Sequence, residues 1–286
     1  MAAKKTTTAA APTNSPVDLE AAWARVKPAS TFESFDKIKA LITGPSKSGK
    51  SHCASLFRKP LYGLTEKQAM ITISRANPDV HVFLINTAAD LFAFREMAKV
   101  AHEKGFDAVV LDSITDAQRI LRNYYTSRQG AKAGRDKTSQ ESWGSIIDAT
   151  ARLAREFRDL PIHVCVIALD EEIVVEEEIR HRPLVSGKKL PNDLCQYFSV
   201  VGFVYVAKQD RGYRHQVMFR GDHHYLVGAP YWLDDTMPPE PQLWISRMTG
   251  DEVPPDVQAR VDAWDALASP EAADSHDADA SAADAE

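Results

Sequence analysis

The sequence predicts an α/β fold, a mostly parallel sheet flanked by helices, with antiparallel strands toward the C-terminal part. Two observations carry this prediction. Short runs such as residues 108–111 are apolar at every position, which is typical of strands covered on both faces. These runs alternate with segments of helical spacing, the pattern of sheets whose parallel strands are joined by helices. Sheets of this kind bind ligands beyond the carboxyl ends of their strands.

The predicted elements follow this alternation along the chain. The apolar run at residues 38–43 ends in a glycine-rich loop, after which a helix is expected. Residues 90–104 place apolar side chains on one helical face, and Gly105 ends that helix because glycine adopts the left-handed conformation easily. The predicted strands are residues 38–43, 69–74, 80–86, 108–111, 162–169, 199–207 and 215–219. The predicted helices are residues 49–57, 90–104, 115–125 and 143–158.

Length and composition set the domain organisation. The chain has 286 residues, of which 44% are hydrophobic, so it can bury one substantial core. Residues 1–29 are expected to form a disordered arm with a short helix, and residues 30–250 the main domain. Residues 251–268 are expected to form a C-terminal helix, followed by a disordered acidic tail at 269–286. The tail carries acids but no Lys or Arg and accounts for the net charge of -6, so any nucleic-acid-binding surface has to be local.

The cysteines and the apolar runs bear on the compartment. Cys53, Cys165 and Cys195 are widely separated and lie in apolar contexts, which indicates buried, reduced thiols. No run approaches the length of a membrane span, and the N-terminus lacks the apolar core of a secretory signal. We therefore expect a cytoplasmic protein with no membrane partner.

The most specific motif is the run Gly44, Pro45, Ser46, Lys47, Ser48, Gly49, Lys50 and Ser51, followed by His52. It fits the pattern G-x-x-x-x-G-K-[ST] between a predicted strand and a predicted helix. Glycines allow successive main-chain N–H groups to point at phosphate oxygens, and the N-terminal end of the helix adds positive potential. We interpret these nine residues as an ATP-binding loop, with Lys50 reaching the β- and γ-phosphates and Ser51 binding Mg²⁺.

A second motif is the apolar run 108–111, which ends in Asp112. A carboxylate at this place can hold Mg²⁺ through its water shell. The alternative is that Asp112 or Ser113 caps the helix expected from residue 115. Because this motif follows the phosphate loop by about sixty residues, we favour the magnesium role and predict Ser51 and Asp112 as the metal ligands, with ATP and Mg²⁺ as cofactors.

Hydrolysis also needs a group that orients the attacking water. No Glu follows Asp112 directly, so this group has to come from elsewhere in the chain. Asp170 and Glu171, just past the strand at 162–169, and Asp90 are candidates, although each could equally be a cap or a solvated loop acid. We choose Glu171 and predict Lys50, Asp112 and Glu171 as the catalytic residues.

Residues 126–140 have the composition of a loop that faces a substrate. The segment carries the basic side chains of Arg128, Lys132, Arg135 and Lys137 and follows two tyrosines. Basic side chains neutralise phosphate and aromatic rings stack on bases, which suits single-stranded nucleic acid, whereas a mobile solvated loop is the alternative. The adjacent pair His223 and His224 lacks a metal-binding spacing, and we expect a surface or partly buried pair there.

With these motifs, the chain resembles the RecA-like P-loop ATPases of phages and prophages, a group of AAA-family ATPases that includes single-strand annealing recombinases. Four stretches carry the resemblance, at residues 44–51, at 109–115, at 143–144 together with 160–172, and at 183–204. It implies a RecA-like core, a homo-oligomer with ATP near its subunit interfaces, and a role beside phage recombination or replication proteins in the bacterial host cytoplasm. Similar proteins often carry an acid where the second strand ends, and Asn86 stands there. They also carry late basic residues that reach a neighbour's γ-phosphate, for which Arg220 is the candidate.

Two functions follow from these observations. The first is an ATPase that couples Mg²⁺-dependent hydrolysis to single-stranded DNA binding, predicted from the nucleotide motifs and the basic segment 126–140. The alternative is a slow or non-hydrolysing ATP-binding switch that acts through a protein partner. The nearly neutral body, the acidic tail and the lack of an acid directly after Asp112 favour this alternative.

Overall fold

The computed structural model describes residues 18–28, 31, 36–133, 140–209 and 212–267. The chain divides into two compact units, residues 1–35 and residues 36–286. The described part of the first unit contains the short helix α1 (Leu19–Trp23), in the N-terminal arm where a short helix is expected. The acidic tail and most of the N-terminal arm lie outside the described residues. No described helix is both long and apolar enough to cross a bilayer.

The second unit is built on an eight-stranded sheet in the order β10-β9-β8-β1-β5-β4-β2-β3. Every neighbouring pair from β3 to β8 is parallel, whereas β9 pairs antiparallel with both β8 and β10. The predicted α/β class, with antiparallel strands on the C-terminal side, is therefore confirmed. The strands are β1 (Lys39–Thr43), β2 (Pro60–Leu64), β3 (His81–Leu84), β4 (Ala108–Asp112), β5 (His163–Ile167), β8 (Val200–Gln209), β9 (Gly212–Met218) and β10 (Thr236–Met237).

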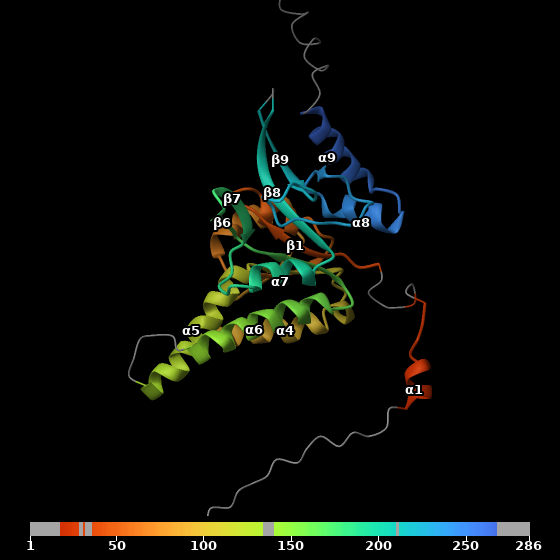
Figure 1. The fold of residues 1–286 in the computed structure, drawn as a ribbon. Helices are drawn as coiled ribbons and strands as arrows, with labels where there is room; N and C mark the ends of the chain where they lie inside the picture. Colours follow the sequence, from red (N-terminus) through yellow and green to blue (C-terminus); the bar gives the residue numbers. More distant parts are fainter. Residues whose placement is uncertain (1–17, 29–30, 32–35, 134–139, 210–211, 268–286) are drawn as a thin grey trace, which may run out of the picture. The chain divides into compact units, whose positions relative to one another are not determined.

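Helices cover both faces of this sheet (Figure 1). One core cluster joins α4, α5, α6 and α7 to residues such as Leu41 and Val109, and the other joins α2, α3, α8 and α9 to Ile42 and Val110. Successive strand residues enter opposite clusters because side chains alternate across a strand, which explains why the strands are apolar throughout. The helices are α2 (Lys50–Ser55), α3 (Met70–Ala76), α4 (Ala88–Lys99), α5 (Ile114–Ala133), α6 (Gln140–Arg158), α7 (Leu190–Tyr197), α8 (Pro241–Thr249) and α9 (Pro255–Ala266).

Three sequence predictions about these elements are wrong. Residues 69–74, predicted as a strand, belong mostly to helix α3, which buries Ile73 and leaves Ile71 67% exposed. The strand β2 was not predicted, because Pro60 and Gly63 are poor strand residues. The segment 126–140, predicted as a loop, is helical through Ala133, because α5 continues well past residue 125.

A separate antiparallel hairpin follows β5. It consists of β6 (Asp170–Val175) and β7 (Glu178–Pro183), which form a two-stranded sheet, and a single bridge joins His181 of β7 to Tyr225. Its turn residues Glu176 and Glu177 both have positive φ, 53° and 70°, as two-residue hairpin turns require. A two-stranded hairpin is marginally stable in water by itself, so contacts at its base matter for its order.

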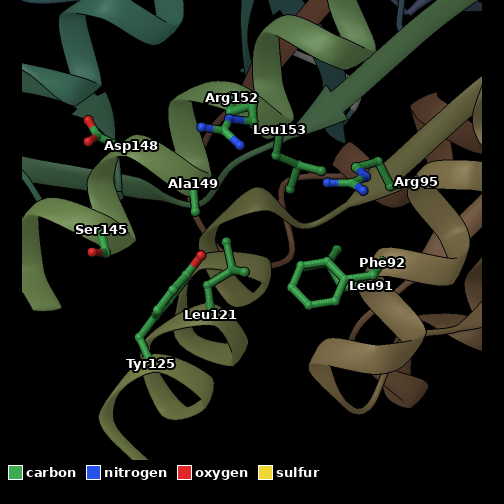
Figure 2. Close-up of a pocket in the computed structure, with 10 residues that line it drawn as sticks. All are labelled: Leu91, Phe92, Arg95, Leu121, Tyr125, Ser145, Asp148, Ala149, Arg152 and Leu153. Carbon is green, nitrogen blue, oxygen red and sulfur yellow. The ribbon is translucent and has the colours of Figure 1, made fainter. Parts of the chain in front are cut away.

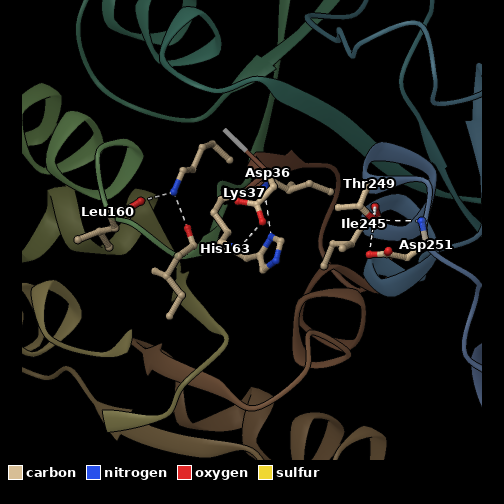
Figure 3. Close-up of polar contacts among 10 residues, drawn as sticks. Asp36, Lys37, Leu160, His163, Ile245, Thr249 and Asp251 are labelled. Atoms are coloured by element: carbon tan, nitrogen blue, oxygen red, sulfur yellow. Dashed lines mark hydrogen bonds and ion pairs between the residues drawn. The ribbon is translucent and has the colours of Figure 1, made fainter. Parts of the chain in front are cut away.

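Two titratable side chains, the buried Lys39 and the half-buried His163, lie where β1 and β5 begin. The ammonium group of Lys39 donates to the carbonyls of Leu160 and Ile162, and burial lowers its pKa to about 8. The backbone N–H of Ile38 donates to Nδ1 of His163 over 3.1 Å (Figure 3). These bonds hold the chain segment before β5 against the start of β1.

His163 should make the stability of the protein depend on pH. Burial, together with the charges of Lys37 and Lys39, lowers its pKa to about 4. Because the folded-state pKa lies below the ordinary value, the contribution is complete above about pH 6.5 and is lost as the pH falls toward 4. Between pH 7 and pH 5 we expect the free energy of unfolding to fall by about 2 kcal/mol from this residue alone.

Denaturant unfolding of the wild type and of His163→Asn at both pH values checks this prediction. The asparagine amide oxygen can still accept the Ile38 N–H but does not titrate. The variant should therefore lose less stability than the wild type on acidification. Equal losses in the two proteins would contradict the assignment.

Candidate functional site

The loop between β1 and α2 has a conformation that requires its glycines. Gly44 and Gly49 have φ of 143° and 101°, in the region that side chains disfavour. A Cβ on Gly44 would lie 2.2 Å from the carbonyl oxygen of Val204, and one on Gly49 would lie 2.9 Å from Nδ1 of His215. The sequence motif therefore folds into a tight strand–loop–helix turn, as predicted.

Lys50 lies inside this loop. Its side chain is 6% exposed, and its amino group donates to the carbonyls of Gly44 and Pro45 over 2.7 Å and 2.6 Å. Burial lowers the pKa of Lys50, while the charge of Asp112 opposes this shift. The hydroxyl oxygen of Ser48 is buried without a hydrogen-bond partner among the described residues. A buried cation and an unpaired hydroxyl in one loop fit an anionic ligand.

Ser51 and Asp112 meet across the site. The Ser51 hydroxyl donates to Oδ2 of Asp112 over 2.7 Å, and the hydroxyl of the fully buried Tyr62 donates to the same oxygen over 2.8 Å. Burial raises the pKa of Asp112, whereas these hydrogen bonds and the charge of Lys50 lower it. Serine hydroxyl and carboxylate oxygens are ligands that Mg²⁺ accepts, so the pair fits the predicted metal position.

These groups line one cavity of about 480 Å³, within the size range of small-molecule sites. It brings together most of the predicted loop residues, Asp112 and several residues that were not predicted. Gly44, Pro45 and Ser48 lie in the same loop but not on the cavity wall. The lining residues are Ser46, Lys47, Gly49, Lys50, Ser51, His52, Glu66, Gln68, Ala69, Thr72, Asp112, Ser113, Asp116, Leu169 and His215.

Glu66 lines the cavity, and the sequence analysis did not single it out. It follows β2, whose last residue Leu64 pairs with Asp112, so the two acids sit at neighbouring strand ends. Partial burial raises the pKa of Glu66, and the charge of Asp116 and a hydrogen bond with it raise the pKa further. The expectation that Asn86 replaces the acid at the end of the second strand is therefore wrong, because the second strand is β2.

The three acids considered for orienting water have other partners. Glu171 lies in β6 and pairs with Arg182 over 2.8 Å, and it does not line the cavity. Asp90 forms the capping box of α4 with Thr87. Asp170 is bonded to His181 over 2.6 Å. The prediction that Glu171 belongs to the catalytic group is not supported by this geometry, because its carboxylate is held on the hairpin.

Strand β9 and helix α9 also hold the phosphate loop in place. Nδ1 of His215, on β9, lies 2.8 Å from the carbonyl oxygen of Ser48. The indole N–H of Trp264, on α9, donates to the backbone carbonyl of His215 over 2.7 Å, and the guanidinium of Arg214 lies 3.6 Å from the centre of the Trp264 ring. No sequence motif marks His215, because only the pairing of β9 with β8 brings it to the loop.

The predicted DNA-binding residues are only partly placed. Arg128 and Lys132 lie on the last turns of α5, whereas Arg135 and Lys137 lie outside the described residues. Arg220, the candidate for reaching a neighbour's phosphate, is used within its own chain. It donates to the carbonyls of Leu233 and Pro230 and pairs with Asp235 over 2.9 Å.

A second cavity of about 250 Å³ lies between α4, α5 and α6 (Figure 2). Its wall mixes apolar side chains such as Leu121 and Leu153 with the arginines Arg95 and Arg152. None of the phosphate-loop residues, nor Asp112 or Glu66, reaches it. The nucleotide chemistry therefore belongs to the loop cavity.

Taken together, the strand–loop–helix turn and the carboxylate beside it define a P-loop nucleotide-binding domain. The chain belongs to the AAA domain family, whose model matches residues 36–228. A search of curated proteins finds no match.

Among solved structures, the flagellar accessory protein FlaH from Methanocaldococcus jannaschii is similar with a TM-score of 0.35 and 8% identity, over 70% of this chain and 85% of that chain. A KaiC-like protein from Pyrococcus horikoshii OT3 is similar with a TM-score of 0.38 and 10% identity, over 63% of this chain and 78% of that chain.

Proposed function

We propose that this protein is a RecA-type, Mg²⁺-dependent ATPase whose hydrolysis is coupled to binding of single-stranded DNA. The observation that carries the ATPase part is the convergence of Lys50, Ser51, Asp112 and Glu66 on one cavity. A cation, two oxygen ligands and a further acid are the groups that phosphoryl transfer to water requires. The family match to an AAA domain supports the same reaction class.

Each of these residues has a distinct role in the proposal. Lys50 leaves the carbonyls of Gly44 and Pro45 and neutralises the β- and γ-phosphates. Ser51 and Asp112 hold Mg²⁺, which supplies positive charge to the phosphate oxygens, and Tyr62 fixes the Asp112 carboxylate by its hydrogen bond. Glu66 orients the attacking water from the end of β2, in place of Glu171.

The DNA part of the proposal rests on helix α5. This helix begins at Ile114, two residues after Asp112, and continues to Ala133. It therefore connects the metal-binding end of β4 to the basic segment that carries Arg128 and Lys132. A helix of this length can transmit a displacement at one end to the other, which supports coupling between nucleotide state and this basic segment of the sequence.

A turnover assay with a panel of nucleic acids tests this proposal. ATP hydrolysis should rise several-fold with single-stranded DNA and less with duplex DNA, and the stimulation should weaken as salt increases. Unchanged turnover, together with no retention of DNA at low salt, would remove the DNA part. Hydrolysis at background with intact ATP binding and nucleotide-dependent capture of a protein would favour the switch instead.

A further inference from the structure

Three side chains with metal-binding chemistry lie on one face of the β6–β7 hairpin. Glu172 stands directly opposite His181 in the hairpin register, and Asp170 is two residues before Glu172 on the same face. One ligand atom of each residue lies within 4.8 Å of the other two. None of these residues takes part in the proposed ATPase chemistry.

Asp170 is the buried member of this group. Its side chain is 5% exposed, its Oδ2 lies 2.6 Å from Nδ1 of His181, and its Oδ1 is buried with no hydrogen-bond partner in the part of the chain that the structure describes. An unpaired carboxylate oxygen away from water is costly and is normally satisfied by a donor or a cation. Burial raises the pKa of Asp170, and the nearby charge of Glu172 adds to that, whereas the His181 contact lowers it.

The two faces of the hairpin differ in their charge balance. On the opposite face Glu171 pairs with Arg182, so that carboxylate is neutralised. On the Asp170 face, neither carboxylate has a Lys or Arg partner among the described residues. The positive charge of Lys50 lowers the pKa of Asp170, but the amino group of Lys50 is hydrogen-bonded to the carbonyls of Gly44 and Pro45.

We propose that Asp170, Glu172 and His181 bind one divalent transition-metal ion of the Zn²⁺ type. One imidazole with two carboxylates suits such an ion, whereas Mg²⁺ prefers oxygen ligands alone. The His181 ring is held by stacking on Tyr225, with centroids 4.7 Å apart and an interplanar angle of 2°. The ion replaces the proton between His181 and Asp170 and ties β6 to β7 at the base of a hairpin that, among the described residues, is joined to other backbone only by the bridge from His181 to Tyr225.

A second histidine cluster provides the competing site. Glu178, His223 and His224 also have ligand atoms within 4.8 Å of one another. Their groups are already engaged, since Glu178 bonds to His223 over 2.9 Å and lies 3.5 Å from Arg180, and His224 bonds to Asp222. The arginine beside Glu178 disfavours a cation there.

Calorimetric titration with Zn²⁺ tests the proposal on the chelator-treated full chain. Excess Mg²⁺ is present and nucleotide is absent, so that the ATP site does not contribute. We expect one Zn²⁺ per chain and slower hydrogen exchange across the β6–β7 hairpin when it binds. Glu172→Gln, at an exposed position that folding does not need, should weaken binding by roughly tenfold or more, as should His181→Ala. Glu171→Gln on the opposite face and His223→Ala should leave the affinity unchanged.

Other results of the titration would overturn the proposal. Absence of stoichiometric binding by the wild type would mean that Asp170 and His181 form only an ion pair. Affinity lost in His223→Ala but kept in Glu172→Gln would place the ion at the second cluster. Unchanged hairpin exchange in the Zn²⁺-bound protein would contradict the tie between β6 and β7. These outcomes are independent of ATP hydrolysis, so they separate this proposal from the proposed function.

Discussion

Replacing Lys50 with alanine is expected to weaken ATP binding by roughly 100-fold and to reduce hydrolysis to background, because removal of a buried charge from a charge pair costs about 3 kcal/mol. Lys50 is the cation enclosed by the phosphate loop, and among the described residues its amino group bonds only to the carbonyls of Gly44 and Pro45. A triphosphate offers this group a stronger, charged acceptor. Nucleotide titration and steady-state hydrolysis measure the two effects.

The matched control for this variant is Lys67→Ala. Lys67 lies in the short helix η2 (Lys67–Ala69) between two cavity residues, Glu66 and Gln68, but does not line the cavity itself. This control should keep ATP binding within about twofold, because an exposed charge is largely screened. A Lys50→Ala protein that is folded and binds ATP as the wild type does would contradict the site assignment.

The part of the site that the sequence predicts is the part encoded locally. Gly44–Ser51 and Asp112 can be recognised in the sequence because each motif directly follows an apolar strand. Each motif is also defined by residues that are neighbours in the chain. The structure brings Ser51 within 2.7 Å of Asp112, as their predicted shared role requires. The two motifs meet although β5 lies between β1 and β4, because all parallel strands of one sheet end at the same edge.

The strand β2 could not be predicted from local propensity. Gly63 leaves room for the ring of Phe94, since a Cβ there would lie 2.4 Å from that ring. A glycine that close packing requires lowers the intrinsic β-propensity of its own segment. Without β2, the sequence does not place Glu66 at a strand end, whereas Glu171 stands just past a recognisable apolar strand.

Helix α3 shows the opposite effect. Its sequence is rich in β-branched residues, which favour strands, yet only Ile73 enters the core while Ile71 faces solvent. Burial of one side chain against the sheet outweighs the small differences in intrinsic propensity. The contacts of His215 with the phosphate loop are likewise tertiary, since they depend on the register of β9 against β8.

Replacing Glu66 with glutamine is expected to slow ATP hydrolysis by about 100-fold or more while changing ATP affinity only a few-fold, the usual scale for loss of a general base. Glutamine keeps the size of the side chain but cannot accept a proton from water. The raised pKa of Glu66 adds a second signature, because the base acts only when ionised. The acidic limb of the rate profile should therefore lie above the ordinary pKa of glutamate, near 4.3, and should be absent in the variant.

Asp116 and Glu171 allow this assignment to be checked from two sides. Asp116→Asn removes the neighbouring charge that raises the pKa of Glu66, so the acidic limb should move to lower pH while hydrolysis persists. Glu171→Gln breaks only the half-buried ion pair with Arg182, away from the cavity, and should leave turnover within about twofold of the wild type. If turnover is instead lost in Glu171→Gln and retained in Glu66→Gln, then the hairpin supplies the base and must move toward the cavity on ATP binding. Glu66 would then have no catalytic role, and its contact with Asp116 in the cavity wall would be structural.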